Sequence, residues 1–167
     1  NPAVRARFAQ LLNSIGQQFD GRIEGINLQE SSIGVSIEYD PSFYNTLYAE
    51  SLKANMRALK DAFPTSTTMQ YANFMPGEWL PFEDKGFLKS LYRYGEEIGV
   101  GLGGPDLMIQ RKGQLNHTIA MMHEHEYSVP LGIAIQDGNY IGQTGADGDI
   151  AESIKTKRKN LAPMLYE

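Results

Sequence analysis

Helix-like and strand-like segments alternate along this chain at a nearly regular interval, and this alternation restricts its fold more than any other feature. The strand-like segments are centred on Ile26, Met69, Gly101 and Ile133, at intervals of 43, 32 and 32 residues. A segment with apolar residues at helical spacing precedes each of them. Such alternation is typical of βα units, which build a parallel sheet. We therefore expect an α/β fold in which residues 1–167 form a single domain, or a fragment, of about four βα units.

The expected helices begin and end at residues that favour helix termini. Asn1 and Pro2 suit the N-cap and the first helical turn, and Asp40 and Pro41 repeat that pattern before a second helical segment. Gly99 follows the third helical segment, where a left-handed glycine ends many helices. These signals predict helices that begin near residues 1 and 40, and a third that ends before residue 99.

The stretch GVGLGG, residues 99–104, matches the G-x-G-x-x-G pattern of dinucleotide-binding loops. In those proteins a strand comes first, then the glycine loop, and then a helix. Here the glycines follow a helical segment and lie within the expected strand, and Pro105 comes directly after them. We therefore interpret these glycines as structural. A nucleotide-binding α/β domain stays as an alternative, and this pattern is its only support.

Composition and charge argue against several classes of partner. The formal net charge is −5, and the basic cluster at residues 155–159 is short, so we expect no nucleic-acid partner. The chain has no cysteine, which excludes disulfides and thiol catalysis. No apolar run approaches the roughly 20 residues of a membrane span, so we expect no membrane partner. His123 and His125 lack the spacing of a zinc helix, and we expect neither a metal nor a cofactor.

Polar and aromatic residues gather where the expected strands end. Ligand sites of parallel α/β folds lie beyond the carboxyl ends of the strands. The site candidates that we place there are Asn27, Glu30, Tyr71, Asn73, Trp79, Asp106, Gln136 and Asp137, and the same strand ends also carry Gln29, Gln70, Phe74, Glu78 and Asn139. Amides and carboxylates hydrogen-bond to hydroxyl groups, and the faces of tyrosine and tryptophan suit the apolar faces of sugar rings. The pattern predicts a carbohydrate site.

Two of these strand ends are INLQE at residues 26–30 and IAIQD at residues 133–137. They resemble catalytic strand ends of the (β/α)8-barrel (TIM-barrel) glycoside hydrolases of clan A. The resemblance extends over nearly the whole chain in the order of the elements. It implies that Glu30 is the acid/base and that Asp137 is the nucleophile, or the base that activates water. The family has asparagine where Gln29 stands and glutamate where Asp137 stands. These departures keep open a non-catalytic carbohydrate-binding or assembly protein on the same scaffold.

The resemblance also implies what else the site and the chain need. The remaining strand-end residues, Asn27, Tyr71, Asn73, Trp79, Asp106 and Gln136, would hold the sugar, without a cofactor. The chain would be a partial barrel, the C-terminal half. Because half a barrel exposes the edges of its sheet, we expect the remainder of the barrel or a second copy of the chain to cover them.

Overall fold

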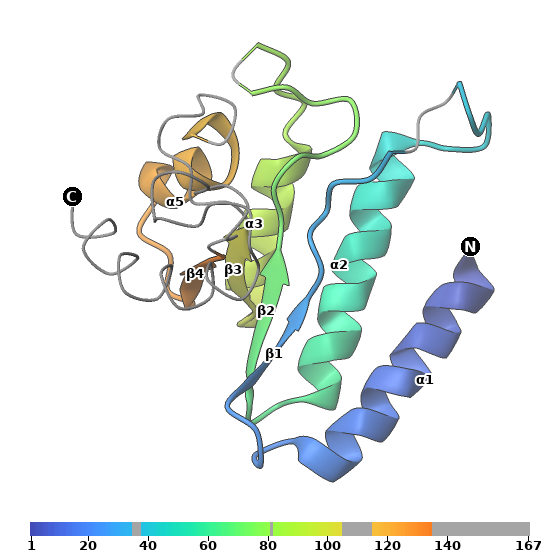
Figure 1. Ribbon diagram of the computed structural model, residues 1–167, viewed down its shortest axis with the longest axis vertical. Helices are drawn as coiled ribbons and strands as arrows, with labels where there is room; N and C mark the ends of the chain where they lie inside the picture. The colour runs from blue at the N-terminus through green and yellow to red at the C-terminus, as the bar shows by residue number, and fades with distance from the viewer. Residues whose placement is uncertain (35–37, 81, 105–114, 135–167) are drawn as a thin grey trace, which may run out of the picture.

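The computed structural model describes residues 1–34, 38–80, 82–104 and 115–134. Helices and strands alternate along them (Figure 1). The elements are α1 (Pro2–Phe19), β1 (Gly25–Leu28), α2 (Asn45–Ala62), β2 (Thr67–Tyr71), α3 (Phe87–Ile98), β3 (Gly101–Gly104), the π-helical turn η1 (Leu115–Ile119), α5 (Ala120–Glu124) and β4 (Leu131–Ile133). The predicted alternation is confirmed.

The strands form one sheet in the order β1-β2-β3-β4, and each is parallel to its neighbours. The register places Leu28 opposite Gln70, and Gln70 opposite Leu102. Helices α1, α2 and α3 pack against the face of the sheet that carries Leu28 and Leu102 (Figure 1). The predicted α/β fold with a parallel sheet is therefore confirmed. A doubly wound sheet reverses its strand order and carries helices on both faces, whereas the described strands of this chain follow one another in sequential order.

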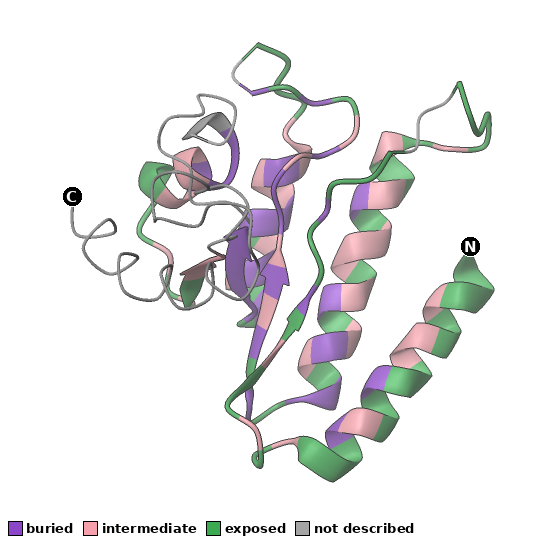
Figure 2. Ribbon diagram, in the orientation of Figure 1, coloured by how far each residue is buried: buried purple, intermediate pink, exposed green. Residues whose placement is uncertain are grey.

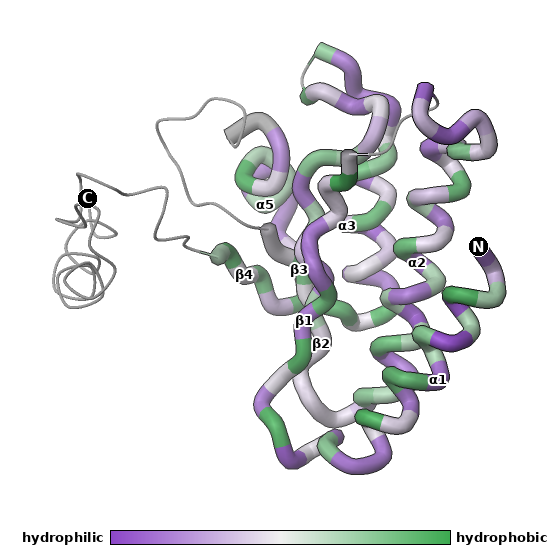
Figure 3. Tube along the Cα trace, turned by 45° about the vertical axis from the view of Figure 1, so that its right-hand side comes forward, coloured by the Kyte–Doolittle hydropathy of each residue, from purple (hydrophilic) through white to green (hydrophobic). Residues whose placement is uncertain are grey.

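Two groups of buried apolar side chains hold the helices on the sheet (Figure 2). Leu12 of α1, Leu28 of β1 and Leu59 of α2 belong to one group. Met56 of α2 and Leu102 of β3 belong to the other, which also takes in α3. Hydrophobic and hydrophilic stretches alternate along α1 and α2 in Figure 3, as expected of helices with one buried face. The buried faces of the helices hold the strands of the sheet in place, and with them the residues at the strand ends.

Helix α1 approaches the backbone of α2 closely at Gly16. A side chain on Gly16 would collide with the carbonyl oxygen of Ala62, at the last residue of α2. Glycine weakens a helix interior by about 1 kcal/mol relative to alanine. Here its missing side chain lets two helices meet backbone to backbone, so the glycine serves the packing of the helices.

The helix termini agree with the sequence in two of the three predicted places. Asn1 caps α1, because its side chain accepts a hydrogen bond of 2.9 Å from the backbone N–H of Ala3. Gly99 ends α3 with a left-handed φ of 73°. The prediction that a helix begins at Asp40 is wrong, since α2 begins at Asn45. The Asp40 carboxylate instead accepts hydrogen bonds from the backbone N–H and hydroxyl of Ser42, at 2.9 and 2.6 Å. The cap-like sequence thus forms a separate turn.

The glycines of β3 leave room for side chains from neighbouring elements. A Cβ atom on Gly103 would lie 2.7 Å from the ring of Tyr71, and one on Gly104 would collide with Thr118. Glycines inside a strand commonly mark such close approaches. The structure thus supports the interpretation of GVGLGG as structural, with its glycines at a helix terminus and in a parallel strand.

Candidate functional site at the carboxyl edge of the sheet

Glu30 and Asn73 lie together where β1 and β2 end. The side-chain amide of Asn73 donates a hydrogen bond of 2.9 Å to Oε2 of Glu30. Glu30 is exposed, whereas Asn73 is buried. The two residues follow paired parallel strands, so their side chains meet at the same edge of the sheet although 43 residues separate them. The structure therefore brings together two of the residues that the sequence singled out.

Ser31 fastens the two strand ends to each other. Its hydroxyl accepts a hydrogen bond of 3.0 Å from the backbone N–H of Asn73 and donates one of 3.3 Å to the carbonyl of Phe74. Its own carbonyl accepts a hydrogen bond of 2.9 Å from the hydroxyl of Tyr48 in α2. Burial raises the pKa of Tyr48, which keeps this donor protonated. Ser31 is completely buried, so these bonds fix the loops beside Glu30.

Gln70 holds the backbone that leads to Glu30. Its amide nitrogen donates to the carbonyl of Gln29 at 2.8 Å and to the carbonyl of Tyr71 at 2.7 Å. Gln70 Oε1 and Asn73 Oδ1 are buried and have no hydrogen-bond donor among the described residues. Each oxygen can accept a hydrogen bond from a buried water.

Three aromatic rings cluster beside this pair of strand ends. The rings of Phe74 and Trp79 stack with their centroids 5.7 Å apart and their planes 23° apart. The His117 ring lies 4.0 Å from Phe74 and 5.3 Å from Trp79, centroid to centroid. His117 is buried, but 49% of the Trp79 surface is exposed. Trp79 is thus an aromatic surface that a ligand can contact, supported from behind by two further rings.

The loop that carries Trp79 is anchored by its neighbour Glu78. The Glu78 carboxylate is buried and accepts three backbone N–H bonds at the start of α3, from Lys85 at 3.0 Å, Phe87 at 2.7 Å and Leu88 at 2.9 Å. Backbone amides at the first turn of a helix favour a negative charge. Glu78 therefore holds the Trp79 loop against α3.

Asn27 and Tyr71 lie on the sheet rather than in the loops beyond it. Asn27 is exposed and pairs with Met69, on the face opposite Leu28. Tyr71 is half-buried, is the last residue of β2 and lies on the same face as Met69, next to Gly103. These two predicted sugar ligands thus share the face of the sheet that lies away from α1, α2 and α3. Asp106, Gln136 and Asp137 lie outside the described residues.

Ser31 and His117 escape a reading of the sequence as residues of this edge, because neither carries a motif that points to it. Glu78 caps a helix that begins nine residues later, beyond the spacing of a capping box. The sequence places Gln70 and Glu78 at the end of the second strand, whereas Ser31 offers only the weak signal of a polar residue beside a strand end.

The described residues contain no group of three or more histidine, aspartate or glutamate side chains that could hold a metal ion. Within the same ranges, no helix is both long and apolar enough to cross a membrane. Comparisons with known proteins found no matching family model, curated protein or solved structure. The geometry at the carboxyl edge therefore carries the functional argument.

Proposed function

We propose that the chain is part of a (β/α)8 barrel that hydrolyses a carbohydrate, with Glu30 as the general acid. The observation that carries this proposal is the hydrogen bond from Asn73 to Glu30 at the carboxyl edge of a parallel sheet, the edge at which α/β barrels bind substrates. The exposed face of Trp79, on the loop that follows, supplies a surface on which a sugar ring can stack.

The arrangement of the sheet supports the barrel. In a (β/α)8 barrel each strand pairs with the next one in sequence, and the helices form an outer ring. The described strands pair in sequential order with α1, α2 and α3 on one face. Among the described residues β1 pairs only with β2 and β4 only with β3, so each leaves one edge for a further strand. We expect the remainder of the barrel or a second copy to occupy these edges.

The proposed chemistry divides the two oxygens of Glu30 between two tasks. Oε2 accepts the amide hydrogen bond of Asn73 and acts as the carbonyl oxygen of the protonated acid. Oε1 carries the proton and donates it to the glycosidic oxygen as the bond to the sugar breaks. Asp137 would attack the anomeric carbon or activate a water. Carboxyl groups roughly 5–5.5 Å apart would predict retention of configuration, and groups roughly 6.5–9.5 Å apart would predict inversion.

The remaining predicted residues would bind the sugar itself. Trp79 would stack on the apolar face of a ring and the exposed amide of Asn27 would hydrogen-bond to its hydroxyls, while the buried Asn73 holds Glu30. Tyr71 lies on the same sheet face as Asn27 and would contact a sugar ring that extends from the loops onto this face of the sheet. In the sequence, Asp106 follows the third expected strand and Gln136 lies at the end of the fourth, so both would also contact the sugar.

Release of reducing sugar from a panel of oligosaccharides tests the proposal. We expect Glu30→Gln to lower the rate about 10²–10⁴-fold, because the amide keeps the shape but cannot donate the proton. Glu24→Gln is the matched control, since Glu24 is an exposed carboxylate immediately before β1 at its opposite end. A Glu30→Gln variant with the wild-type rate would contradict the assignment. Saturable glycan binding without release of sugar would instead support the non-catalytic carbohydrate-binding protein.

A further inference from the structure

We propose that the loops beyond β1 and β2 bind an extended glycan chain without acidic groups, in addition to the sugar at Glu30. The inference rests on the proposed function and names its substrate class. The described parts of the two loops are residues 29–34 and 38–44 after β1, and residues 72–80 and 82–86 after β2. We call them the rim loops. In Figures 1 and 3 both project from the end of the molecule at which the strands end.

Exposed aromatic side chains gather on the rim loops. Among the described residues, the large aromatic side chains that are exposed are Phe19, Tyr39, Tyr44, Trp79 and Phe82. All but Phe19 lie on the rim loops. Tyr39 is 82% exposed and Phe82 is 79% exposed. Because apolar surface that gathers in one region commonly marks an interaction site, these side chains are candidates for contact with a ligand.

The second rim loop holds its aromatic side chains in a fixed turn. The backbone N–H of Trp79 donates to the carbonyl of Glu83 at 3.0 Å, and the N–H of Glu83 donates to the carbonyl of Trp79 at 2.8 Å. Phe82 lies within this turn, and Glu78 ties the loop to the start of α3. A ligand that contacts a loop of this kind loses little affinity to the ordering of the chain.

The first rim loop lies directly against the second. Gly77 has a left-handed φ of 76°, and a Cβ atom on it would collide with the side chain of Asn45, the first residue of α2. Tyr44 directly precedes Asn45. The hydroxyl of Ser31 also joins the loops, through its hydrogen bond of 3.3 Å to the carbonyl of Phe74. The aromatic side chains thus belong to two adjoining loops on either side of the Glu30 site.

The charge of the rim loops selects among glycans. They carry six carboxylates and one lysine, a net charge of −5 that equals the formal net charge of the whole chain. These residues are Glu30, Glu38, Asp40, Glu78, Glu83, Asp84 and Lys85. All of the carboxylates except Glu78 are exposed. Exposed carboxylates accept hydrogen bonds from sugar hydroxyls and repel uronic acids and sulfated sugars.

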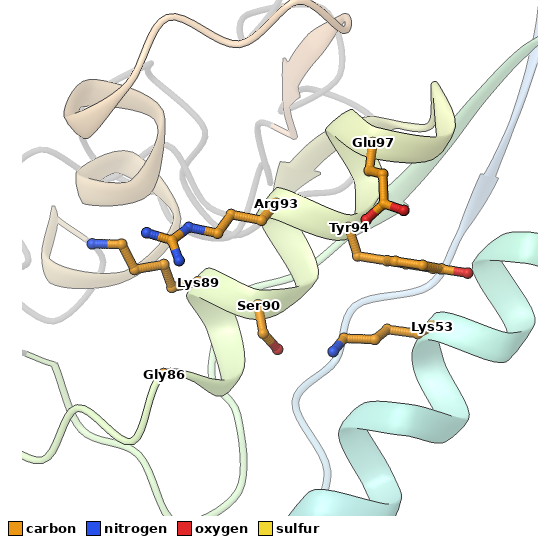
Figure 4. Close-up of a pocket in the computed structure, with 7 residues that line it drawn as sticks. All are labelled: Lys53, Gly86, Lys89, Ser90, Arg93, Tyr94 and Glu97. Carbon is orange, nitrogen blue, oxygen red and sulfur yellow. The ribbon is translucent and has the colours of Figure 1, made fainter.

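Basic side chains of the neighbouring helices do not offset this charge. Lys53 of α2 pairs with Glu50 at 2.9 Å, and Lys89 of α3 pairs with Glu124 at 3.0 Å. In Figure 4 the head groups of Lys89 and Arg93 extend from α3 away from Lys53 and toward α5. These cations therefore do not gather beside the rim loops, where an acidic glycan would need them.

A glycan chain suits this surface better than other ligands with stacking or apolar groups. Sugar rings stack on aromatic faces, and their hydroxyls donate to carboxylates. Single-stranded nucleic acid also stacks on aromatic rings, but its phosphates require lysine and arginine, and so do anionic lipid surfaces. Because the exposed rings are spread over two loops, several sugar units are needed to contact them all. A long chain should therefore bind more tightly than a short one.

Titration calorimetry of the Glu30→Gln chain tests the proposal, since this variant keeps the shape of the site but cannot donate the proton. The probes are the dimer and hexamer of three series: neutral cello- and manno-oligosaccharides, cationic glucosamine chains and anionic galacturonate chains. We expect neutral or cationic hexamers to bind about tenfold more tightly than their dimers, and the galacturonate hexamer not to bind. Hexamers that bind no more tightly than dimers, or a galacturonate hexamer that binds as well as the others, would overturn the proposal.

The same titrations separate this proposal from the proposed hydrolysis. Equal binding of dimers and hexamers, with release of reducing sugar by the wild-type chain, would overturn the extended site and leave the hydrolysis standing. Binding that grows with chain length, without release of sugar, would support the extended site and contradict the hydrolysis.

Phe82→Ala and Tyr39→Ala should each weaken hexamer binding about threefold to tenfold and leave dimer binding unchanged, because each removes one stacking surface. Both side chains are exposed, so neither substitution disturbs the core. Phe19→Ala is the matched control, since Phe19 is an exposed aromatic residue at the end of α1. Equal weakening by Phe19→Ala would overturn the proposal. Self-association in sedimentation that Phe82→Ala abolishes would assign the rim loops to a second copy instead, and would also overturn it.

Discussion

The side-chain amide of Asn73 hydrogen-bonds to Oε2 of Glu30 at 2.9 Å, joining the ends of two parallel strands. Glu30 is exposed, whereas Asn73 is buried. Asn73 is in turn held by Ser31, so the position of Glu30 depends on the backbone of both loops. A carboxylate that is held through one oxygen keeps the other for a ligand.

Asn73→Asp should destabilise the protein at neutral pH. The substitution puts a second carboxylate against Glu30 in a buried position, where like charges disfavour each other. We expect a loss of about 1–3 kcal/mol in the free energy of unfolding at pH 7. The loss should shrink in acid, where a protonated carboxyl can donate the hydrogen bond that the amide donated. Urea unfolding at several pH values measures it, with the exposed Asn27→Asp as control. A loss that is the same at every pH would rule out the charge explanation.

Glu78→Gln should loosen the loop that carries Trp79. The amide group would turn an N–H donor toward the backbone N–H groups of Phe87 or Leu88, and the favourable charge at the start of α3 would be lost. We expect a destabilisation of about 1–2 kcal/mol. Trp79 is the single tryptophan, so its fluorescence reports on this loop directly. The exposed Glu83→Gln, on the same loop, should change neither quantity. Unchanged fluorescence in Glu78→Gln would show that other contacts hold the loop.

Gly16→Ala should destabilise the protein although alanine is the better helix former. The new methyl group would collide with the carbonyl oxygen of Ala62, which belongs to the backbone and cannot turn aside. Overpacking of this kind costs about 1–3 kcal/mol, which exceeds the gain in helix propensity of about 1 kcal/mol. Thermal unfolding measures the sum. Gln18→Ala, at an exposed position of the same helix, should be neutral or slightly stabilising. A more stable Gly16→Ala would mean that α1 can shift away from α2.

Acid should weaken the attachment of residues 125–128 to α3. The backbone N–H of Ser128 donates to Glu96 at 2.8 Å and lowers the pKa of that carboxyl, with smaller effects from the Ser128 hydroxyl and from His125. A carboxyl whose pKa falls on folding stabilises the protein above its unfolded pKa, and this stabilisation is lost as the pH falls through the folded pKa. Unfolding curves of wild type and Glu96→Gln should therefore differ at neutral pH and converge in acid. Glu97→Gln, exposed and one residue away, should follow the wild type throughout.

Gly99→Ala should cost stability without changing any response to nucleotides. The φ angle of Gly99 is 73°, where a side chain is strained by about 1–2 kcal/mol, although a Cβ atom there would meet only Lys60 at 3.7 Å. Thermal melting with and without NAD, NADP, FAD and ATP measures both effects. A saturable rise in melting temperature that Gly101→Val abolishes would revive the nucleotide-binding alternative.

The order of the elements was predictable because it depends on local patterns. Apolar spacing places the helices, Asn1 caps the first one, and Gly99 ends the third. The Asp40 prediction failed because an aspartate before a proline stabilises an isolated turn as readily as a helix start, and nothing within a few residues distinguishes the two. Strand ends were placed to within a few residues, which was enough to select Glu30 and Asn73 as site candidates.

By itself, the sequence determined the alternation of helix and strand, the structural role of the glycines at 99–104, and the strand ends at which Glu30 and Asn73 lie, since each follows from neighbours along the chain. Only the tertiary structure decided which of those residues meet. The pairing of β1 with β2 brings Asn73 to Glu30, and the packing of α3 occupies Glu78 with backbone amides and leaves Trp79 exposed. The physical reason is that hydrogen bonds across 40 residues or more depend on strand register and helix packing, and burial summed over many side chains sets both.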